Sequence, residues 1–306
     1  MSLEQAWYGS SKWLILLRPL AWLFGYLSRR RRRKLSVFAK GPDKPILIVG
    51  NLSVGGSGKT PLIIELIRLA QGLGIKPGVI SRGYGGKAQH YPLIVDQSTP
   101  VDQSGDEPKL IVIKTGVPLV VSPDRVAAAE LLSNTYDIDL ILSDDGLQHY
   151  GLTRDFEIAV IDGERGLGNG KLLPEGPLRE PGSRLEEVDL VVVNGQGGDW
   201  PNAIRYELIP RQLINLKTGE LIEANPEALG RRYVSAIAGI GNPDRFFNLL
   251  ENLGFQVSAR ALGDHAKITA SDLTLVNDQP LIMTEKDAVK CVSFATENCW
   301  ALSVQA

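Results

Sequence analysis

Cysteine and histidine are scarce in this sequence, as is any excess of charge of one sign. Its 306 residues include two cysteines and three histidines, and 33 basic residues face 35 acidic ones. The spacing of Cys291 and Cys299 fits neither a zinc knuckle nor a redox pair, so we expect ordinary thiols in a reducing compartment. A net charge of -2 gives no global basic field, so we expect no nucleic-acid partner.

An apolar run long enough to cross a bilayer is also missing. The longest candidate, residues 13–27, carries only the charge of Arg18 and is interrupted by Pro19. As a helix it would span about 22 Å at 1.5 Å per residue, whereas a bilayer core of roughly 30 Å needs more. Spanning is therefore not expected, and a signal peptide fits poorly because the charged residues follow the apolar stretch.

The N-terminal region instead has the features of a segment that lies on a membrane. Residues 29–34 form an unbroken basic run, and aromatic side chains that favour the membrane interface gather before it: Trp7, Tyr8, Trp13, Trp22 and Tyr26. Each basic residue near an anionic surface contributes about 1 kcal/mol. We predict an amphipathic, monotopic anchor over residues 1–34 that binds anionic lipids; the alternative is a buried helix followed by a solvated basic loop.

The rest of the chain alternates short apolar strands with helical segments, which predicts parallel α/β architecture. Residues 35–202 read as an α/β/α core of the P-loop NTPase type, and residues 203–306 as a second, smaller α/β domain. The predicted strands are 45–49, 76–80, 118–122, 140–143, 157–161, 189–193, 234–238, 255–259 and 281–283, with 205–216 extended. The predicted helices are 59–73, 124–134 and 243–253, the last capped by Asn242.

A glycine-rich loop over residues 50–61 follows the first of these strands and precedes a helix, as the P-loop motif requires. Its glycines let backbone amides face a phosphate, and the helix N-terminus adds positive charge. Lys59 can reach the β- and γ-phosphates, and Thr60 can ligate Mg²⁺. Ser53 stands where the motif has its first glycine. The expected nucleotide-binding residues are Ser53, Val54, Gly55, Gly56, Ser57, Gly58, Lys59 and Thr60.

Asp144 and Asp145 end another predicted strand, as does the acidic partner of a P-loop, so we expect Mg²⁺ there in addition to Thr60. The alternative is a carboxylate pair that caps the following turn.

Two classes of P-loop protein fit this sequence poorly. The closest match to a guanine-reading Asn-Lys-x-Asp box is residues 284–287, whose lysine is one place late. The extra lysine of partitioning-type ATPases is replaced by Val54.

The chain resembles the tetraacyldisaccharide 4'-kinase family of lipid A biosynthesis almost from end to end. The blocks that carry the resemblance are GNLSVGGSGKTP (50–61), SRGYGG (81–86), GDEP (105–108), DDGLQH (144–149), PEGPLREPGSRL (174–185), AGIGNPDRFF (238–247), GDH (263–265) and TEKDAVK (284–290). The resemblance implies transfer of the ATP γ-phosphoryl group to the 4'-hydroxyl of a tetraacylated disaccharide 1-phosphate. It also implies a location at the cytoplasmic face of the bacterial inner membrane and two α/β/α domains joined by a two-stranded hinge at about 203–212 and 299–305. We expect a monomer.

The same resemblance suggests roles for particular residues. Asp106 matches a base for the acceptor hydroxyl, and His265 matches a histidine that holds the aspartate ionised. From the residues alone, Asp106 is a loop carboxylate. Arg125 is expected to stabilise phosphoryl charge, or else to form a surface salt bridge. The residues expected on the lipid-substrate side are Tyr84, Glu107, Gln148, His149 and Arg179, the last as a bidentate ligand of the 1-phosphate.

Several alternatives stay open at this point. Lys286 and Asp287 could be a structural ion pair near the hinge, and residues 266–268 depart from the family pattern after His265. A membrane-associated P-loop NTPase that acts as a switch, without a lipid acceptor, is the alternative function. A nucleotide-binding module without enzymatic activity is a third. Asp106 separates the first two, because a transferase needs an acceptor base.

Overall fold

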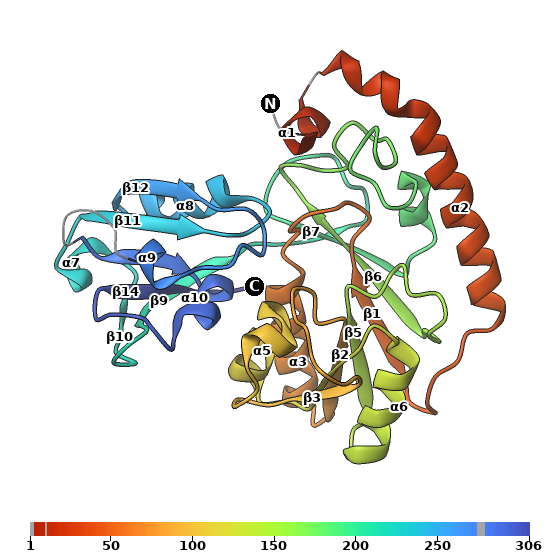
Figure 1. Ribbon diagram of the computed structural model, residues 1–306, viewed down its shortest axis with the longest axis horizontal. Coiled ribbons are helices and arrows are strands. Elements are labelled where there is room, and N and C mark those ends of the chain that lie inside the picture. The colour runs from red at the N-terminus through yellow and green to blue at the C-terminus, as the bar shows by residue number, and fades with distance from the viewer. Residues whose placement is uncertain (1–2, 10, 274–278) are drawn as a thin grey trace. The chain divides into compact units, whose positions relative to one another are not determined.

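The computed structural model describes residues 3–9, 11–273 and 279–306, and the chain folds into two compact units (Figure 1). Unit 1 comprises residues 1–82, 90–94 and 115–207, and unit 2 comprises residues 83–89, 95–114 and 208–306. The stretches 83–89 and 95–114 thus group with the C-terminal residues, although the sequence predicted them within a core over 35–202.

Unit 1 is built on an eight-stranded sheet with the order β3-β4-β2-β5-β1-β6-β7-β8. Each neighbouring pair in this order, from β4·β2 through to β7·β8, is parallel. In chain order the strands are β1 (Ile46–Gly50), β2 (Pro77–Ser81), β3 (Leu93–Val95), β4 (Leu119–Val121), β5 (Leu140–Asp144), β6 (Phe156–Asp162), β7 (Leu190–Asn194) and β8 (Ile204–Tyr206). Every strand predicted for this part of the chain is present; β3 was not predicted.

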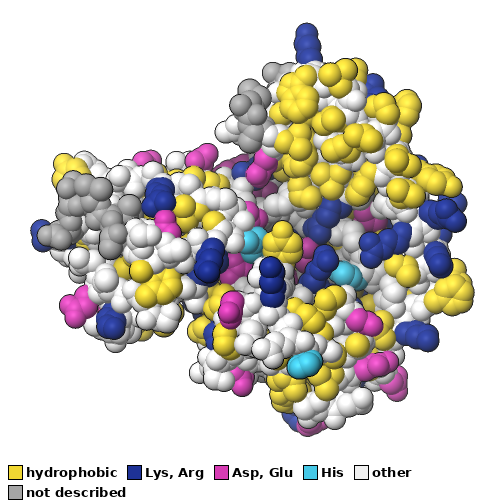
Figure 2. All heavy atoms as spheres, viewed as in Figure 1, with side chains coloured by type: hydrophobic (Ala, Val, Ile, Leu, Met, Phe, Trp, Pro, Cys, Tyr) yellow, Lys and Arg dark blue, Asp and Glu magenta, His cyan; other side chains and the backbone are white. Residues whose placement is uncertain are grey.

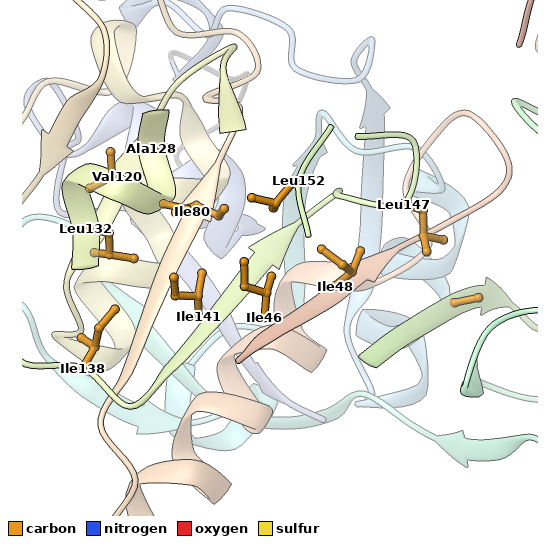
Figure 3. Close-up of a cluster of buried hydrophobic side chains, with 12 residues drawn as sticks. Ile46, Ile48, Ile80, Val120, Ala128, Leu132, Ile138, Ile141, Leu147 and Leu152 are labelled. Atoms are coloured by element: carbon orange, nitrogen blue, oxygen red, sulfur yellow. The ribbon is translucent and has the colours of Figure 1, made fainter. Parts of the chain in front are cut away.

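Apolar side chains on both faces of this sheet are buried, as expected for a parallel sheet covered by helices. Ile46 and Ile48 of β1 lie in one cluster with Ala128 and Leu132 of α6 (Arg125–Thr135) (Figure 3). Helix α3 (Lys59–Gly72) also packs on β1, β2 and β5. The α/β/α core predicted from the alternation of strands and helices is confirmed.

The predicted helix boundaries hold to within a residue or two, because local capping signals set them. Asp124 accepts hydrogen bonds from the amides of Val126 and Ala127 and caps α6. Asn242 caps α8 (Pro243–Asn252) by accepting from the amide of Arg245. In unit 1 a 3₁₀ turn, η2, covers Gly182–Glu186.

Unit 2 holds a six-stranded mixed sheet with the order β10-β9-β14-β13-β11-β12. Its strands are β9 (Ile209–Asn215), β10 (Leu221–Glu223), β11 (Tyr233–Ala238), β12 (Gln256–Ala261), β13 (Leu281–Thr284) and β14 (Cys299–Gln305). Its helices are α4 (Val101–Ser104), most of α5 (Asp106–Thr115), α7 (Pro226–Leu229), α8, α9 (Ala270–Leu273) and α10 (Glu285–Cys291). Strands β9 and β14, which include residues of the predicted hinge, pair antiparallel.

The N-terminal segment forms α1 (Leu3–Tyr8), a 3₁₀ turn η1 (Lys12–Leu17) and α2 (Arg18–Val37). Pro19 does not interrupt the helix as the sequence suggested, since it lies in the first turn of α2, where its missing amide hydrogen costs nothing. The basic run is part of this same helix. No helix among the described residues is both long and apolar enough to cross a membrane.

One face of α2 packs against the rest of unit 1 and the other is exposed. An added Cβ at Gly25 would lie 2.7 Å from Leu172, so the helix approaches the core closely there. Arg18 binds Glu175 at 2.8 Å, and Arg32 binds Glu187. Trp22 and Leu23 of α2 are 71% and 53% exposed, and Leu16 of the preceding turn η1 is 77% exposed. Figure 2 shows hydrophobic side chains gathered over this part of the surface, with Lys and Arg beside them.

Candidate active site

The glycine-rich loop lies at the carboxyl edge of the unit 1 sheet, where ligands of open α/β sheets bind. It connects β1 to α3, and its backbone is held by the segment 177–179: Val54 donates to Pro177 and Arg179 donates to Leu52, at 2.9 and 2.7 Å. Gly58 has a φ of 88°, and a Cβ there would lie 2.2 Å from Asn194. This glycine is required by both its conformation and its neighbours.

Lys59 is placed by polar groups at the base of the loop. Its Nζ lies 3.1 Å from Oδ1 of Asn51 and 3.4 Å from Oδ1 of Asp145. Asn51 is fully buried, also donates to the carbonyl of Gly55, and accepts from Arg179. Sequence reasoning missed Asn51, although its position directly after a buried strand and inside the glycine loop was a usable signal.

The two aspartates after β5 have different surroundings. Asp144 is 1% exposed, and its Oδ2 accepts a 2.8 Å bond from Ser81 of β2. Asp145 has a positive φ of 49° and receives two 2.9 Å bonds from the guanidinium of Arg179. Burial alone would raise the pKa of Asp145, but Lys59 and Arg179 outweigh it and hold that pKa well below its ordinary range.

Residues that could hold Mg²⁺ are present in this arrangement. Mg²⁺ in phosphoryl-transfer sites is usually bound by one or two carboxylates, a hydroxyl, waters and substrate phosphates. Thr60 is the second residue of α3, directly after the loop, and Asp144 is the last residue of β5, which pairs with β1. The oxygens of Asp145 are already bound by Arg179 and Lys59. Asp144 therefore fits a direct ligand better than Asp145 does.

Arg125 is not the surface salt bridge that the sequence left open. It is 3% exposed and donates from Nη2 to the carbonyl of Asp144 at 2.7 Å. Among the described residues its Nε and Nη1 are buried without a hydrogen-bond partner, and so is the Oγ of Ser57. Buried donors without partners are costly, so these atoms fit a site that receives phosphate oxygens.

The residues predicted on the lipid-substrate side fall into two places. In unit 1, Gln148 donates to Glu180 at 2.9 Å and to the carbonyl of Asn51 at 3.3 Å. Burial and the charge of Arg125 lower the pKa of His149 to about 3, so it is neutral at neutral pH. The guanidinium of Arg179 donates two hydrogen bonds to the carboxylate of Asp145. Arg179 therefore belongs with the residues around the nucleotide loop.

Tyr84 and Glu107 lie in unit 2, close to the predicted base. Asp106 is not in a loop, as the sequence suggested, but is the first residue of α5 and is 4% exposed. Gly105 precedes it with a φ of 86°, and a Cβ there would lie 2.6 Å from the carbonyl of Tyr84. The negative charge of Asp106 is favourable at a helix N-terminus.

His265 and Asp106 are in contact, as the resemblance implied. Nδ1 of His265 lies 3.0 and 3.1 Å from the two carboxylate oxygens, and the ring packs edge-on against Tyr84 with centroids 4.6 Å apart. Burial would raise the pKa of Asp106, but the bond from His265 and the charges of Lys286 and Lys290 lower it to about 2. The carboxylate is therefore ionised at neutral pH and able to accept a proton.

Lys286 and Asp287 are not simply paired with each other. Nζ of Lys286 is 3.0 Å from Glu107, whereas Asp287 is buried and accepts from the amide of Gly239 and from Lys290. Lys290 also lies 3.3 Å from Asp106. The TEKDAVK block thus surrounds the Asp106–His265 pair with cations, which sequence reasoning did not anticipate.

Comparison with known proteins places the chain in a family. The family model described as tetraacyldisaccharide-1-P 4'-kinase matches residues 13–306. Tetraacyldisaccharide 4'-kinases of Pseudomonas putida (strain W619) and Haemophilus influenzae (strain 86-028NP) are 47% and 49% identical, each over 98% of this chain and 90% of the relative.

The fold is also similar to a crystal structure of LpxK from Aquifex aeolicus in complex with ATP. That chain is 28% identical, with a TM-score of 0.78, over 95% of this chain and 94% of the other. The family model also spans the greater part of both units, because its match runs from residue 13 to residue 306. This chain belongs to the tetraacyldisaccharide-1-P 4'-kinase family.

Proposed function

We propose that this protein transfers the γ-phosphoryl group of ATP to the 4'-hydroxyl of a tetraacyldisaccharide 1-phosphate, the lipid A precursor that gives lipid IVA. The observation that carries this proposal is the buried, ionised carboxylate of Asp106 bonded to His265. A nucleotide switch needs a water-positioning group, whereas a transferase needs a base for its acceptor hydroxyl. The name of the family, tetraacyldisaccharide-1-P 4'-kinase, indicates the acceptor.

In the proposed reaction the loop residues 53–60 bind the phosphates of ATP through backbone amides and the helix N-terminus. Lys59 and Arg125 balance the charge that spreads over the transferring group. Thr60 and Asp144 hold Mg²⁺, with Asp145 in support. The metal, when bound, neutralises charge on the β- and γ-oxygens. Asp145 and Asn51 keep Lys59 in place, since both bind its Nζ.

Asp106 acts on the acceptor. The 4'-oxygen forms a bond to the γ-phosphorus while the bond from that phosphorus to the β–γ bridging oxygen breaks, leaving ADP. The hydroxyl proton passes to the carboxylate of Asp106. His265 orients the carboxylate and keeps it ionised. We assign contacts with the disaccharide to Tyr84, Glu107, Gln148 and His149. Arg179 can reach a substrate phosphate only if it exchanges its bonds to Asp145.

The exposed face of η1 and α2 is proposed as the surface that meets the lipid, at the cytoplasmic face of the inner membrane. Exposed Leu16, Trp22 and Leu23 give it an apolar half, and residues 29–34 of the same helix give it a basic half. Such a helix lies in the interface without spanning it. We also propose that the protein acts as a monomer, since one chain carries both the donor loop and the proposed acceptor base.

The test is incubation of the full-length protein with γ-labelled ATP, Mg²⁺ and tetraacyldisaccharide 1-phosphate in detergent micelles. Label in the lipid, at the 4'-position, is the expected result. Label that appears only in free phosphate supports the NTPase switch and overturns the kinase. Omitting the disaccharide serves as the control, because a transferase then releases little label.

A further inference from the structure

The two ring nitrogens of His265 face groups of opposite character. Nδ1 lies 3.0 and 3.1 Å from the carboxylate oxygens of Asp106, and Nε2 lies 3.2 Å from Nζ of Lys286. A neutral imidazole donates from one nitrogen and accepts at the other. The identities of the two partners therefore decide which nitrogen carries the hydrogen.

Lys286 is a donor at this site. It lies on α10, and its side chain is 13% exposed, with Nζ 3.0 Å from Glu107 and 3.3 Å from Asp264. Burial opposes its charge, but the carboxylates of Glu107, Asp106 and Asp264 outweigh burial and raise its pKa above the ordinary value. An ammonium group has three donors and no acceptor. Nε2 of His265 must therefore be the acceptor in this contact.

The contact of Nδ1 with Asp106 also places the ring hydrogen of His265 on Nδ1. Asp106 is ionised at neutral pH, so its oxygens only accept, and Nδ1 of His265 must donate to them. Asp264 is the other group that could compete for a hydrogen on Nε2. Its Oδ1 lies 3.8 Å from Nε2, beyond hydrogen-bond distance, and closer to Lys286, at 3.3 Å.

We propose that Lys286 is a positioning residue that fixes His265 as the neutral tautomer with its hydrogen on Nδ1. This proposal rests on the function given above, in which Asp106 is the base for the acceptor hydroxyl. Because Nδ1 already carries a hydrogen, His265 cannot remove the acceptor's proton from Asp106 through that contact. The proton therefore passes to the carboxylate and no further along this contact, and the histidine acts by orienting the carboxylate.

The geometry also explains why one lysine of α10 does not replace the other. Lys290 lies 3.3 Å from Asp106 and 3.0 Å from Asp287, so it supports the carboxylate directly. Lys286 alone, among the described lysine and arginine side chains, has an amine within hydrogen-bond distance of His265. Removing Lys286 therefore frees Nε2, while the bond partners of Lys290 stay intact.

The tautomer is measured by ¹⁵N NMR of the full-length protein in detergent micelles, with histidine ring nitrogens labelled. The chain has only His90, His149 and His265, and the spectrum of His265→Asn identifies the third set of signals. At neutral pH we expect a protonated Nδ1 and an unprotonated Nε2 on His265. Lys286→Met should replace this pattern with exchanging tautomers, and Lys286→Arg, which still donates, should restore it.

Activity is a second readout on the same variants. Lys286→Met should reduce transfer to the lipid by roughly ten- to a hundredfold, the range seen when groups that orient metal-ligating histidines are lost, and Lys286→Arg should recover most of it. The matched control is Lys267→Met, because Lys267 is exposed two residues after His265. It should change neither the spectrum nor the rate.

A wild-type spectrum with the hydrogen on Nε2 overturns the proposal, without any variant. So does a Lys286→Met spectrum identical to the wild type, even if activity falls. If the wild-type protein shows the expected tautomer but labels no lipid, the kinase assignment fails while the role of Lys286 stands. If Lys286→Met does not fold, the wild-type spectrum decides.

Discussion

The two groups of functional residues in this protein are built in different ways. The glycine-rich loop of unit 1 is one continuous segment, and its conformation follows from strand, glycines and helix in sequence order. The Asp106 group of unit 2 is assembled from residues 84, 105–107, 264–265 and 286–290, which only tertiary structure brings together. Recognition of a phosphate donor is thus encoded locally, whereas a base for the acceptor is not.

Their electrostatics differ as well. Around Asp106 the carboxylate and its cations neutralise one another within the protein, so the pair is set before substrate arrives. Around the loop, Arg125 keeps two buried nitrogens without a partner among the described residues. The first group is prepared to accept a proton, and the second is prepared to receive negative oxygens.

The largest effect is expected from Asp106→Asn. The amide keeps the shape of the carboxylate but cannot accept the hydroxyl proton, so transfer should fall by about 10³-fold. Radiolabel incorporation into the lipid measures the change. Asp102→Asn is the matched control, because Asp102 is exposed on the preceding short helix. A rate for Asp106→Asn within a few-fold of the control would refute the proposed base.

Lys59→Met tests the loop. It removes a cation that balances phosphoryl charge and also leaves Asp145 with one fewer partner, so transfer should fall on the order of 10²-fold. The rate at saturating ATP and Mg²⁺ is the measurement. Lys76→Met, which loses only an exposed ion pair with Asp137, should behave as the wild type. Equal losses in both variants would contradict a specific role for Lys59.

Much of unit 1 could be predicted from sequence because its signals are local. Apolar strands, a glycine loop and the Asp124 cap lie within a few residues of the features that they determine. The start of α5 could not be predicted, because Asp106 looks like a solvated carboxylate until Gly105 packs against the carbonyl of Tyr84. The partners of Asp145 were also hidden, since Arg179 comes from a segment 34 residues away.

The membrane surface gives a smaller, separable effect. Trp22→Glu replaces a side chain that is 71% exposed on α2. Losing its burial in lipid should cost about 2 kcal/mol, or about thirtyfold in partition to anionic vesicles. Vesicle co-sedimentation measures it. Leu73→Glu, at 78% exposure on the loop after α3, is the control and should bind as the wild type does; a similar loss there would argue against a specific surface.

The smallest effect concerns the pKa of Asp106. Because that pKa is lowered from 3.8 to about 2, the stabilisation from the ionised carboxylate is fully present above about pH 4 and is lost as pH falls toward 2. His265→Asn removes the bond from the ring and should raise the pKa by about one unit. A ¹³C titration of the carboxyl group checks this shift, and a pKa that does not move would exclude His265 as its cause.

The most direct test of the division between the two groups compares ATP binding with lipid phosphorylation in the same variants. Isothermal titration with Mg²⁺ and a non-hydrolysable ATP analogue gives the affinity, and radiolabel transfer gives the rate. We predict that Asp106→Asn binds the analogue as tightly as the wild type while losing transfer, and that Lys59→Met loses both. Asp106→Asn with equally weakened nucleotide affinity, or with full transfer, would contradict this division.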